Sequence, residues 1–453
     1  MPDPRLSFVR PIGASYYIRS SKLTADDYQG LVDRGWRRSG TLLYKPDNRL
    51  SCCAQYTIRI PVADFKPRKD QRTAVNKWNR FVLGDEYQKE AAKLYPISKE
   101  EKKRQRNEYD LARTIHESEY SEVRTPPEPA HRFEVTLEED AFTQEKFVLF
   151  QNYQEHVHRE PAAETTPGSF KRFLCGSPII RETVHDHSTG KTKKLGSYHQ
   201  VYRLDGRLIA MAVLDLLPHC VSGVYFMYHS DFEKWSFGKL SALREANLAL
   251  EAAYSYYYMG YYIHSCQKMR YKGDYQPQYF LDLDTFAWDR LDEEATKLME
   301  KKKYVSMSRE RALKATQNGP APSPNLDGSE GKDTQMTNQY EENGNSAESD
   351  SNFAVQSVAD IDQAGASVIE CGMPGVMSVD ELEQQIDLDD INIKISPTTI
   401  TKTSNIVSWD SGSMTDLKSL KGIIAELAAC VGPEVMNSGT LVANFSRDSP
   451  TAG

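Results

Sequence analysis

Side chains that could bind and position charged substrates are concentrated in residues 196–273. An arginine can grip a carboxylate with two parallel hydrogen bonds, and a histidine or tyrosine can accept or direct a proton. No Ser–His–Asp or Cys–His pattern stands out in the sequence. These residue types favour catalysis by binding and positioning of the reactants. The candidates are Asp215, Tyr228, Arg244, Glu245, Tyr262, His264, Lys268, Arg270, Tyr271 and Lys272.

Three strand-like runs, a helix and a further strand must position these side chains. The runs are 198–204, 207–216 and 221–229, and Asp205-Gly206 tolerates the positive φ angles of a two-residue type I′ hairpin. A helix-like run over 238–253 and a short aromatic strand over 256–264 follow. This order is that of the N-acetyltransferase-like fold, in which an acyl donor and an acceptor amine meet where the sheet splays. The segment therefore indicates acyl transfer onto an amine.

Charge is distributed unevenly along the 453 residues, whose net charge is −8. Residues 66–113 carry 14 basic and 8 acidic side chains, whereas residues 301–453 carry 12 basic and 22 acidic ones. The basic segment could meet RNA phosphates or form a solvated helical surface of mixed charge. Because residues 316–370 hold few large apolar side chains, we expect them to be disordered. One amphipathic helix is expected later, around Leu420, Ile424 and Leu427.

These patterns predict an α+β protein in four parts. We expect a small N-terminal α/β domain over 1–65 and a basic helical connector over 66–130. An N-acetyltransferase-like domain with a mixed, largely antiparallel sheet is expected over 131–300, and a mostly disordered acidic tail over 301–453. Seven irregularly spaced cysteines do not form a disulfide framework, and neither a secretion signal nor an apolar membrane span is found. We therefore expect a protein of the cytoplasm, and also of the nucleus, without membrane contact.

Two separate blocks of sequence resemble a known family. The C-terminal block holds 198–202 (YHQVY), 241–245 (SALRE) and 258–273 (YMGYYIHSCQKMRYKG), and the N-terminal block holds 33–40 (DRGWRRSG), 44–46 (YKP) and Cys52-Cys53. Their order and spacing resemble the arginyl-tRNA–protein transferases over roughly residues 22–80 and 130–290. The resemblance implies a monomer that transfers arginine from arginyl-tRNA to the N-terminal amine of proteins beginning with Asp, Glu or oxidised Cys. Arginylation marks such proteins for N-degron-dependent degradation.

The resemblance gives the candidate residues three tasks. The acidic side chain of the acceptor needs a cation, for which Arg244 is favoured, with Lys268 and Lys272 more suited to tRNA phosphate. The arginyl group of the donor needs a carboxylate, and the amine needs a proton acceptor. For each residue taken singly, a surface ion pair or a core tyrosine hydroxyl is an equal alternative. The candidates for binding the acceptor or the tRNA are Arg244, Lys268, Arg270, Tyr271 and Lys272. Asp215 or Glu245 is expected to bind the arginyl group, and His264, Tyr228 or Tyr262 to accept the proton of the amine. If none of the cations binds the acceptor's acid, Arg37 and Arg38 are the next candidates.

Cys52 and Cys53 depart from the family pattern. The resemblance implies that this dicysteine joins an upstream CxxC to hold an iron–sulfur cluster or another metal such as zinc, but residues 1–28 contain no cysteine. Two adjacent thiolates cannot supply the four ligands of such a cluster. We expect an incomplete metal site, either because preceding sequence is missing or because this version lacks it. The transfer itself needs no cofactor, because the tRNA ester is already activated.

Two other functions remain open on sequence grounds. A CoA-dependent N-acetyltransferase would share the fold, but its pyrophosphate loop needs several glycines, whereas 235–240 (WSFGKL) has only Gly238. A tRNA- or degron-binding pseudoenzyme would account for the missing CxxC.

Overall fold

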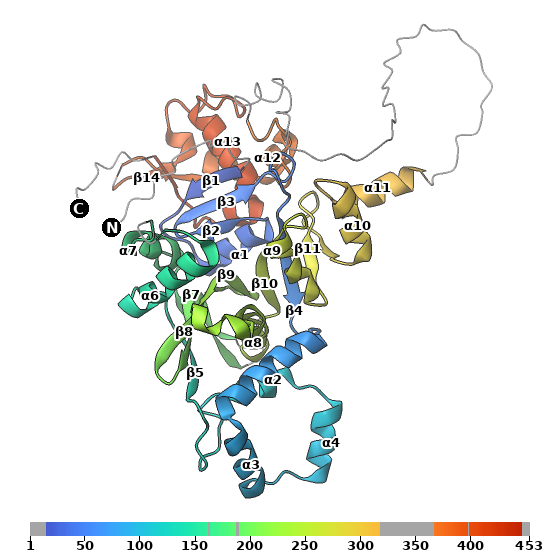
Figure 1. Cartoon of the computed structure of the whole chain (residues 1–453). Coiled ribbons are helices and arrows are strands. Elements are labelled where there is room, and N and C mark those ends of the chain that lie inside the picture. The colour runs from blue at the N-terminus through green and yellow to red at the C-terminus, as the bar shows by residue number, and fades with distance from the viewer. Residues whose placement is uncertain (1–14, 162–163, 187–189, 318–366, 397, 446–453) are drawn as a thin grey trace, which may run out of the picture.

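A nine-stranded sheet forms the centre of the protein (Figure 1). The computed structural model describes residues 15–161, 164–186, 190–317, 367–396 and 398–445. The strand order is β12-β11-β4-β10-β9-β8-β7-β5, with β6 paired to β7, and only β9 and β10 pair in parallel. The predicted α+β class with a mixed, largely antiparallel sheet is confirmed. The strands are β4 (Tyr56–Pro61), β5 (Phe133–Glu139), β6 (Glu182–Asp186), β7 (Lys191–Leu204), β8 (Arg207–Leu216), β9 (Cys220–Tyr228), β10 (Tyr256–Tyr262), β11 (Tyr279–Leu281) and β12 (Trp288–Arg290).

The local signals of the central segment are confirmed. Asp205 and Gly206 have φ angles of 52° and 81° and join β7 to β8 in the expected two-residue hairpin. Helix α8 (Phe237–Glu251) follows β9 and leads into β10, as the apolar spacing predicts. Residues 182–186 and 191–195 pair with each other as β6 and the start of β7.

Helices cover both faces of the sheet. Because successive side chains of a strand point to opposite faces, two adjacent tyrosines of β10 identify the layers. Tyr257 reaches Glu245 of α8, whereas Tyr258 reaches Asp33 of α1 (Ala25–Asp33). The α8 face also carries α2 (Lys69–Leu83) and α5 (Leu111–His116), and α6 (Gln144–Tyr153) packs on β8 and β9.

The N-terminal residues do not form a core of their own. A three-stranded sheet of β1 (Ser15–Arg19), β3 (Leu42–Pro46) and β2 (Arg37–Ser39) packs with α1, whose N-cap is Thr24. The next strand, β4, lies between β10 and β11 in the central sheet. The boundary expected near residue 65 therefore cuts through a shared sheet, because strand alternation shows that a strand forms but not which strand it pairs with.

A buried ion pair joins the small sheet to the central one. Arg38 Nη2 and Nε lie 2.6 and 2.8 Å from the two carboxylate oxygens of Asp215, and both side chains are at most 1% exposed. Ser197 Oγ donates a further hydrogen bond to Asp215. Asp215, predicted as a ligand of the donor's arginyl group, is therefore occupied by a structural partner.

We predict that removing one member of this pair strongly destabilises the fold. Asp215→Ala should lower the free energy of unfolding by roughly 3–5 kcal/mol, because Arg38 would remain buried without its counter-charge. Urea denaturation measures the loss, and Asp85→Ala, which breaks the exposed Arg80–Asp85 pair, is the control with a change within about 1 kcal/mol. A double variant Arg38→Met/Asp215→Leu should recover much of the loss. Equal effects of the buried and the exposed substitution would contradict the assignment.

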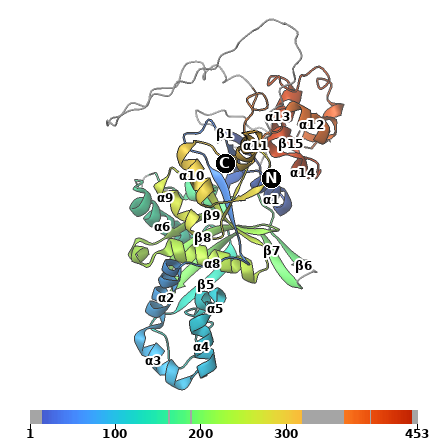
Figure 2. The same ribbon diagram turned by 90° about the vertical axis from the view of Figure 1, so that its right-hand side faces the viewer.

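The predicted basic connector is helical and extends away from the sheet (Figure 2). Its helices α2, α3 (Asp85–Leu94), α4 (Lys99–Asn107) and α5 form an arm at the end of the molecule opposite residues 367–445. After β12 the chain forms α10 (Glu293–Lys301) and α11 (Met307–Gln317).

The prediction of a mostly disordered tail is wrong for residues 367–445, here called the C-terminal module. This module packs against α1 and buries Ile424, Ala428 and Val431 completely, and Trp36 Nε1 donates to Cys430 O at 3.1 Å. The low apolar content of the whole tail concealed one apolar run, 420–431, which forms the expected amphipathic helix. Most of the stretch 316–370 lies outside the described residues. The module contains α12 (Val379–Gln385), α13 (Leu420–Val431), α14 (Pro433–Met436), β13 (Asn392–Lys394), β14 (Ile400–Lys402) and β15 (Ala443–Asn444).

Candidate active site

The parallel strands β9 and β10 part halfway along their length. They pair only from Tyr256↔Cys220 to Tyr258↔Ser222, although β9 continues to Tyr228 and β10 to Tyr262. Both strands shift register on their other side at this level, β9 against β8 and β10 against β4. In β10 the irregularity falls at Gly260, whose φ of +73° is accessible to glycine at little cost. This opening, called here the strand splay, is where acyl transfer was expected.

Glu245 of α8 is buried at the splay. Tyr257 Oη donates to its Oε2 at 2.6 Å and Ser241 Oγ donates to its Oε1, and Oε2 lies 3.2 Å from the position that a Cβ on Gly223 would take. Burial raises the pKa of Glu245 to about 7, although the two hydroxyls and the charge of Lys272 act in the opposite direction. A carboxyl group with this pKa exchanges a proton readily near neutrality.

Lys272 lies at the bulge of β10. Its Nζ donates to the carbonyl oxygens of Met259 and Tyr261, both at 2.9 Å. Burial lowers the pKa of Lys272 to about 8, the charge of Arg37 lowers it further, and the charge of Glu245 raises it. Lys272 therefore interacts with an acid from the α8 layer and with a cation from β2.

Arg37 is the second cation of this site. It is 6% exposed, its guanidinium carbon lies 5.1 Å from the centre of the Tyr261 ring, and its Nη1 donates to Trp36 O at 2.7 Å. Its Nε and Nη2 are buried and have no acceptor among the described residues. A buried guanidinium with two free donors is suited to bind an external carboxylate. The sequence ranked Arg37 behind Arg244 as the residue that binds the acceptor's acid. The sequence of a β-strand does not show whether an arginine in it has an acidic partner.

The structure brings some predicted residues together at or beside the splay. Glu245 and Lys272 form its centre, and the charge of Glu245 helps to raise the pKa of the neighbouring Tyr271. Tyr262 Oη lies 2.7 Å from His264 Nδ1 just beyond β10. Burial lowers the pKa of His264, and its buried Nε2 has no hydrogen-bond partner among the described residues. Lys268 and Arg270 are exposed on α9 (Gln267–Arg270), and Arg270 Nε donates to His264 O at 3.1 Å.

Tyr228 belongs to a different cluster. It lies at the end of β9 among aromatic rings, stacked on Phe237 with ring centres 6.2 Å apart and edge-on to Tyr153. Burial raises its pKa, which makes the hydroxyl a poorer proton donor. These contacts fit the packing alternative that the sequence left open.

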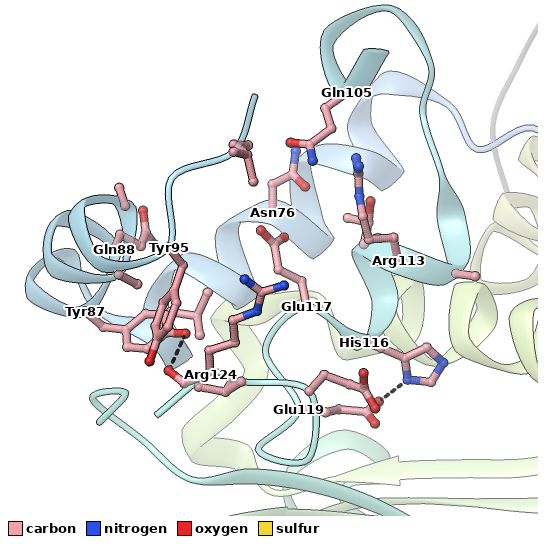
Figure 3. Close-up of a pocket in the computed structure, with 18 of the residues that line it drawn as sticks. Asn76, Tyr87, Gln88, Tyr95, Gln105, Arg113, His116, Glu117, Glu119 and Arg124 are labelled. Atoms are coloured by element: carbon pink, nitrogen blue, oxygen red, sulfur yellow. Dashed lines mark hydrogen bonds and ion pairs between the residues drawn. The ribbon is translucent and has the colours of Figure 1, made fainter. Parts of the chain in front are cut away.

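Arg244 points away from the splay, toward the connector. It pairs with Glu119 and donates through Nη2 to Ile115 O at 2.8 Å. Glu119 also lines a hollow of about 1050 Å³ enclosed by the connector helices, where it meets His116 at 2.9 Å (Figure 3). Hydrogen bonds that His116 donates to the carboxylates of Glu119 and Glu251 raise the pKa of His116 to about 9. Arg244 thus has internal partners, as Asp215 does, and these contacts do not favour it as the reader of an acceptor.

The first turn of α8 is covered by protein. Phe237 is 1% exposed and packs edge-on against Trp78 of α2 with ring centres 5.0 Å apart. Lys239 Nζ lies 2.8 Å from Asp70, which is also in α2. This is the position at which a pyrophosphate would meet the helix N-terminus in an acetyl-CoA enzyme. The packing therefore adds to the case against CoA as donor.

Cys52 and Cys53 lie in the connection from β3 to β4, exposed and partly exposed respectively. Within the ranges that the structure describes, no group of three or more Cys, His, Asp or Glu side chains is arranged to hold a metal ion. Among those same residues, no helix has the length and apolar character needed to cross a membrane.

Comparison with known proteins identifies the family that the chain resembles. A family model described as "Arginine-tRNA-protein transferase, N terminus" matches residues 9–73, and one described as "Arginine-tRNA-protein transferase, C terminus" matches residues 145–282. An arginyl-tRNA--protein transferase 1 of Dictyostelium discoideum is 26% identical, with 64% of this chain and 82% of the relative covered. The enzyme of the same name from Saccharomyces cerevisiae is 32% identical over 55% of this chain and 47% of its own length.

Other relatives are named for the transfer of a different amino acid, leucine. An aspartate/glutamate leucyltransferase of Pseudomonas fluorescens is 30% identical over 55% of this chain and 77% of its own length. Among solved structures, the C-terminal domain of a putative lysylphosphatidylglycerol synthetase from Agrobacterium fabrum is 10% identical over 51% of this chain and 50% of that domain, with a TM-score of 0.24, too low to indicate a shared fold. The family matches and the names of the relatives identify an aminoacyltransferase. The two matched regions and the relatives show that the chain belongs to the arginine-tRNA-protein transferase family.

Proposed function

We propose that this chain transfers arginine from arginyl-tRNA to the N-terminal α-amine of proteins that begin with Asp, Glu or oxidised Cys, and so marks them for degradation through the N-degron pathway. The observation that carries the proposal is the coupled pair of Glu245 and Lys272 at the strand splay, inside the region matched by the family. The finer fold assignment, an N-acetyltransferase-like domain, rests on the order β7-β8-β9-α8-β10 with parallel β9 and β10.

The chemistry requires little beyond positioning. The neutral α-amine attacks the ester carbonyl carbon of arginyl-tRNA, the new amide bond forms, and the bond to the ribose oxygen breaks. Holding amine and ester in contact can supply effective molarities of roughly 10⁵ M or more. The proton lost by the amine passes to the Glu245 carboxylate, which then returns it to the departing ribose oxygen, so that the ribose leaves as a hydroxyl.

Glu245 suits the role of proton acceptor better than the candidates from β9 and β10. Its pKa of about 7 leaves a large fraction ionised at neutral pH while keeping it basic enough to accept a proton. A carboxylate has about four acceptor sites, so the bonds from Ser241 and Tyr257 leave room for an amine. His264 and Tyr262 then lie at the rim of the site. Because Asp215 is paired with Arg38, binding of the donor's arginyl group is the alternative role for Glu245, and the two roles exclude each other.

Arg37 and Lys272 are suited to hold the acidic side chain of the acceptor. Arg37 offers two unused donors, and Lys272 lies close enough for the two charges to affect each other. Lys268, Arg270 and Tyr271 lie on the exposed surface beside the splay, where phosphates of the tRNA end can be met. We also propose a monomer that acts in the cytoplasm and nucleus, which light scattering and imaging of the tagged chain test.

We predict that the purified chain holds substoichiometric iron and no stable four-cysteine cluster. Cys52 and Cys53 provide only two adjacent thiolates, and a cluster requires four ligands. Anaerobic reconstitution followed by iron and sulfide analysis measures this, with Cys52→Ser/Cys53→Ser as the matched control. One full cluster per chain that is lost in the control would show that other ligands complete the site.

One assay separates the proposed function from its two alternatives. The chain is incubated with a peptide beginning with Asp and either charged [¹⁴C]arginyl-tRNA or labelled acetyl-CoA. We expect label in the peptide from arginyl-tRNA alone. Label from acetyl-CoA would identify an acetyltransferase, and binding of tRNA without transfer of label would identify a pseudoenzyme.

A further inference from the structure

A cleft of about 530 Å³ lies between the C-terminal module and the β1–β3 sheet, away from the strand splay. One side is formed by the loop Gly372–Ser378 with α12 and α14, and the other by residues near α1 and after β11. Neither family match extends beyond residue 282, so the side of the cleft that the C-terminal module forms lies outside the matched regions. Its walls combine apolar side chains with three arginines, Arg34, Arg49 and Arg309.

Cations beneath this cleft are buried or unpaired. Arg34 is 6% exposed, its guanidinium carbon stands 4.0 Å from the centre of the Phe286 ring, and its Nε has no acceptor among the described residues. Lys45 is fully buried with Nζ 2.5 Å from Arg34 O and 2.9 Å from the position that a Cβ on Gly375 would take. Burial and the charge of Arg34 lower the pKa of Lys45 to about 7.

The cleft is lined by three acids, Asp284, Glu381 and Glu434, two of which accept hydrogen bonds from other groups. Asp284 accepts from Arg309, and Glu381 accepts from the backbone N and the hydroxyl of Ser378. Glu434 is 71% exposed and reaches Arg34 only at 3.7 Å. Arg34 is also affected by the charge of Glu381, whereas the exposed Arg49 forms no ion pair among the described residues. Arg49 Nη1 lies 3.7 Å from the position that a Cβ on Gly372 would take, so it lies against the same glycine-containing loop.

We propose that this cleft binds a small organic phosphate of about nucleotide size. Arginine forks match the geometry of phosphate oxygens, and an incoming dianion would be an acid partner for Arg49, which has none among the described residues. The volume lies within the usual range for small-molecule sites, and Leu283, Met373 and Met377 provide an apolar wall for the rest of the ligand. Such a ligand would contact both sides and hold the C-terminal module on α1 and the small sheet.

The test is ligand binding by the full chain, measured by calorimetry and by thermal denaturation. The probes are ATP, inorganic pyrophosphate, adenosine and a short RNA duplex. The variants are Arg34→Gln and Arg49→Gln, with Arg19→Gln as an exposed control on β1. Arg49 is exposed, so its variant keeps the test valid if Arg34→Gln does not fold.

We expect ATP and pyrophosphate to bind and to raise the Tm, because a ligand that binds only the folded state stabilises it. Arg49→Gln should weaken ATP binding at least about tenfold, Arg19→Gln should not change it, and adenosine should bind more weakly than ATP. The proposal is overturned if ATP and pyrophosphate do not bind, if Arg49→Gln binds ATP like the wild type, or if the RNA duplex displaces ATP. None of these measurements depends on arginine transfer.

Discussion

Glu245→Gln is expected to lower kcat/KM for arginine transfer about a hundredfold. A positioned proton acceptor typically contributes a factor of about 10²–10⁴, and an amide cannot accept the proton of the attacking amine. Single-turnover transfer to an Asp-initiated peptide at saturating arginyl-tRNA measures the loss. Glu251→Gln, at the exposed end of the same helix, is the matched control and should keep the wild-type rate.

The pH dependence distinguishes this role from a structural one. The wild-type rate should rise with pH through about 7 as Glu245 ionises, and again near pH 8, where the peptide amine loses its proton. The variant should keep only the second rise. An unchanged profile would contradict the role of base. A raised KM for arginyl-tRNA with an unchanged profile would instead place the donor's guanidinium on Glu245.

Stability provides an independent check on Glu245. Its pKa in the folded state exceeds the usual value of 4.5, so between pH 4.5 and about 7 the folded chain retains a proton that the unfolded chain loses. The folded state then binds more protons than the unfolded state, and the free energy of unfolding falls as the pH rises through this window. Glu245→Gln should remove this contribution.

Arg37→Gln should lower kcat/KM roughly ten- to a hundredfold for peptides that begin with Asp or Glu, and much less for peptides that begin with Ala. A hydrogen bond to a charged group contributes about 1.5–3 kcal/mol, and an Ala peptide forms none there. Lys272→Gln should act in the same direction. Competition between Asp- and Ala-initiated peptides measures the discrimination directly.

Lys268→Gln and Arg270→Gln are the controls for acceptor recognition. Both residues are exposed beside the splay, so their loss should weaken tRNA binding with every acceptor and reduce the salt dependence of that binding by about one unit of slope each. If Arg37→Gln, Lys272→Gln, Lys268→Gln and Arg270→Gln all keep the wild-type preference for Asp over Ala, the acidic side chain is bound elsewhere in the protein.

Local structure followed from the sequence where short-range chemistry decides it. Asp205-Gly206 predicted the hairpin, and apolar spacing predicted α8. Long-range pairing did not follow, since nothing in 56–61 indicates that β4 lies between β10 and β11. The acidic tail misled for a related reason, because composition averaged over 153 residues conceals one apolar helix.

The site was predictable in location but less so in assignment. The sequence does not distinguish an arginine or carboxylate that binds a substrate from one that pairs with another residue of the protein. Asp215 and Arg244 proved to have Arg38 and Glu119 as partners, whereas Arg37 has no acid partner in the described structure. The altered pKa of Glu245 depends on burial created by β9, β10 and α8 together, which no single segment reveals.

The identity of the transferred amino acid tests the central claim most directly, because relatives of this chain are named for arginine and for leucine. An Asp-initiated peptide is incubated with the purified chain and equal amounts of arginyl-tRNA and leucyl-tRNA, and the product is read by tandem mass spectrometry. We predict one arginine added at the N-terminal amine by the wild type and a strongly reduced yield with Glu245→Gln. Leucine at that position, or equal yields of arginylated peptide from wild type and variant, would contradict the account.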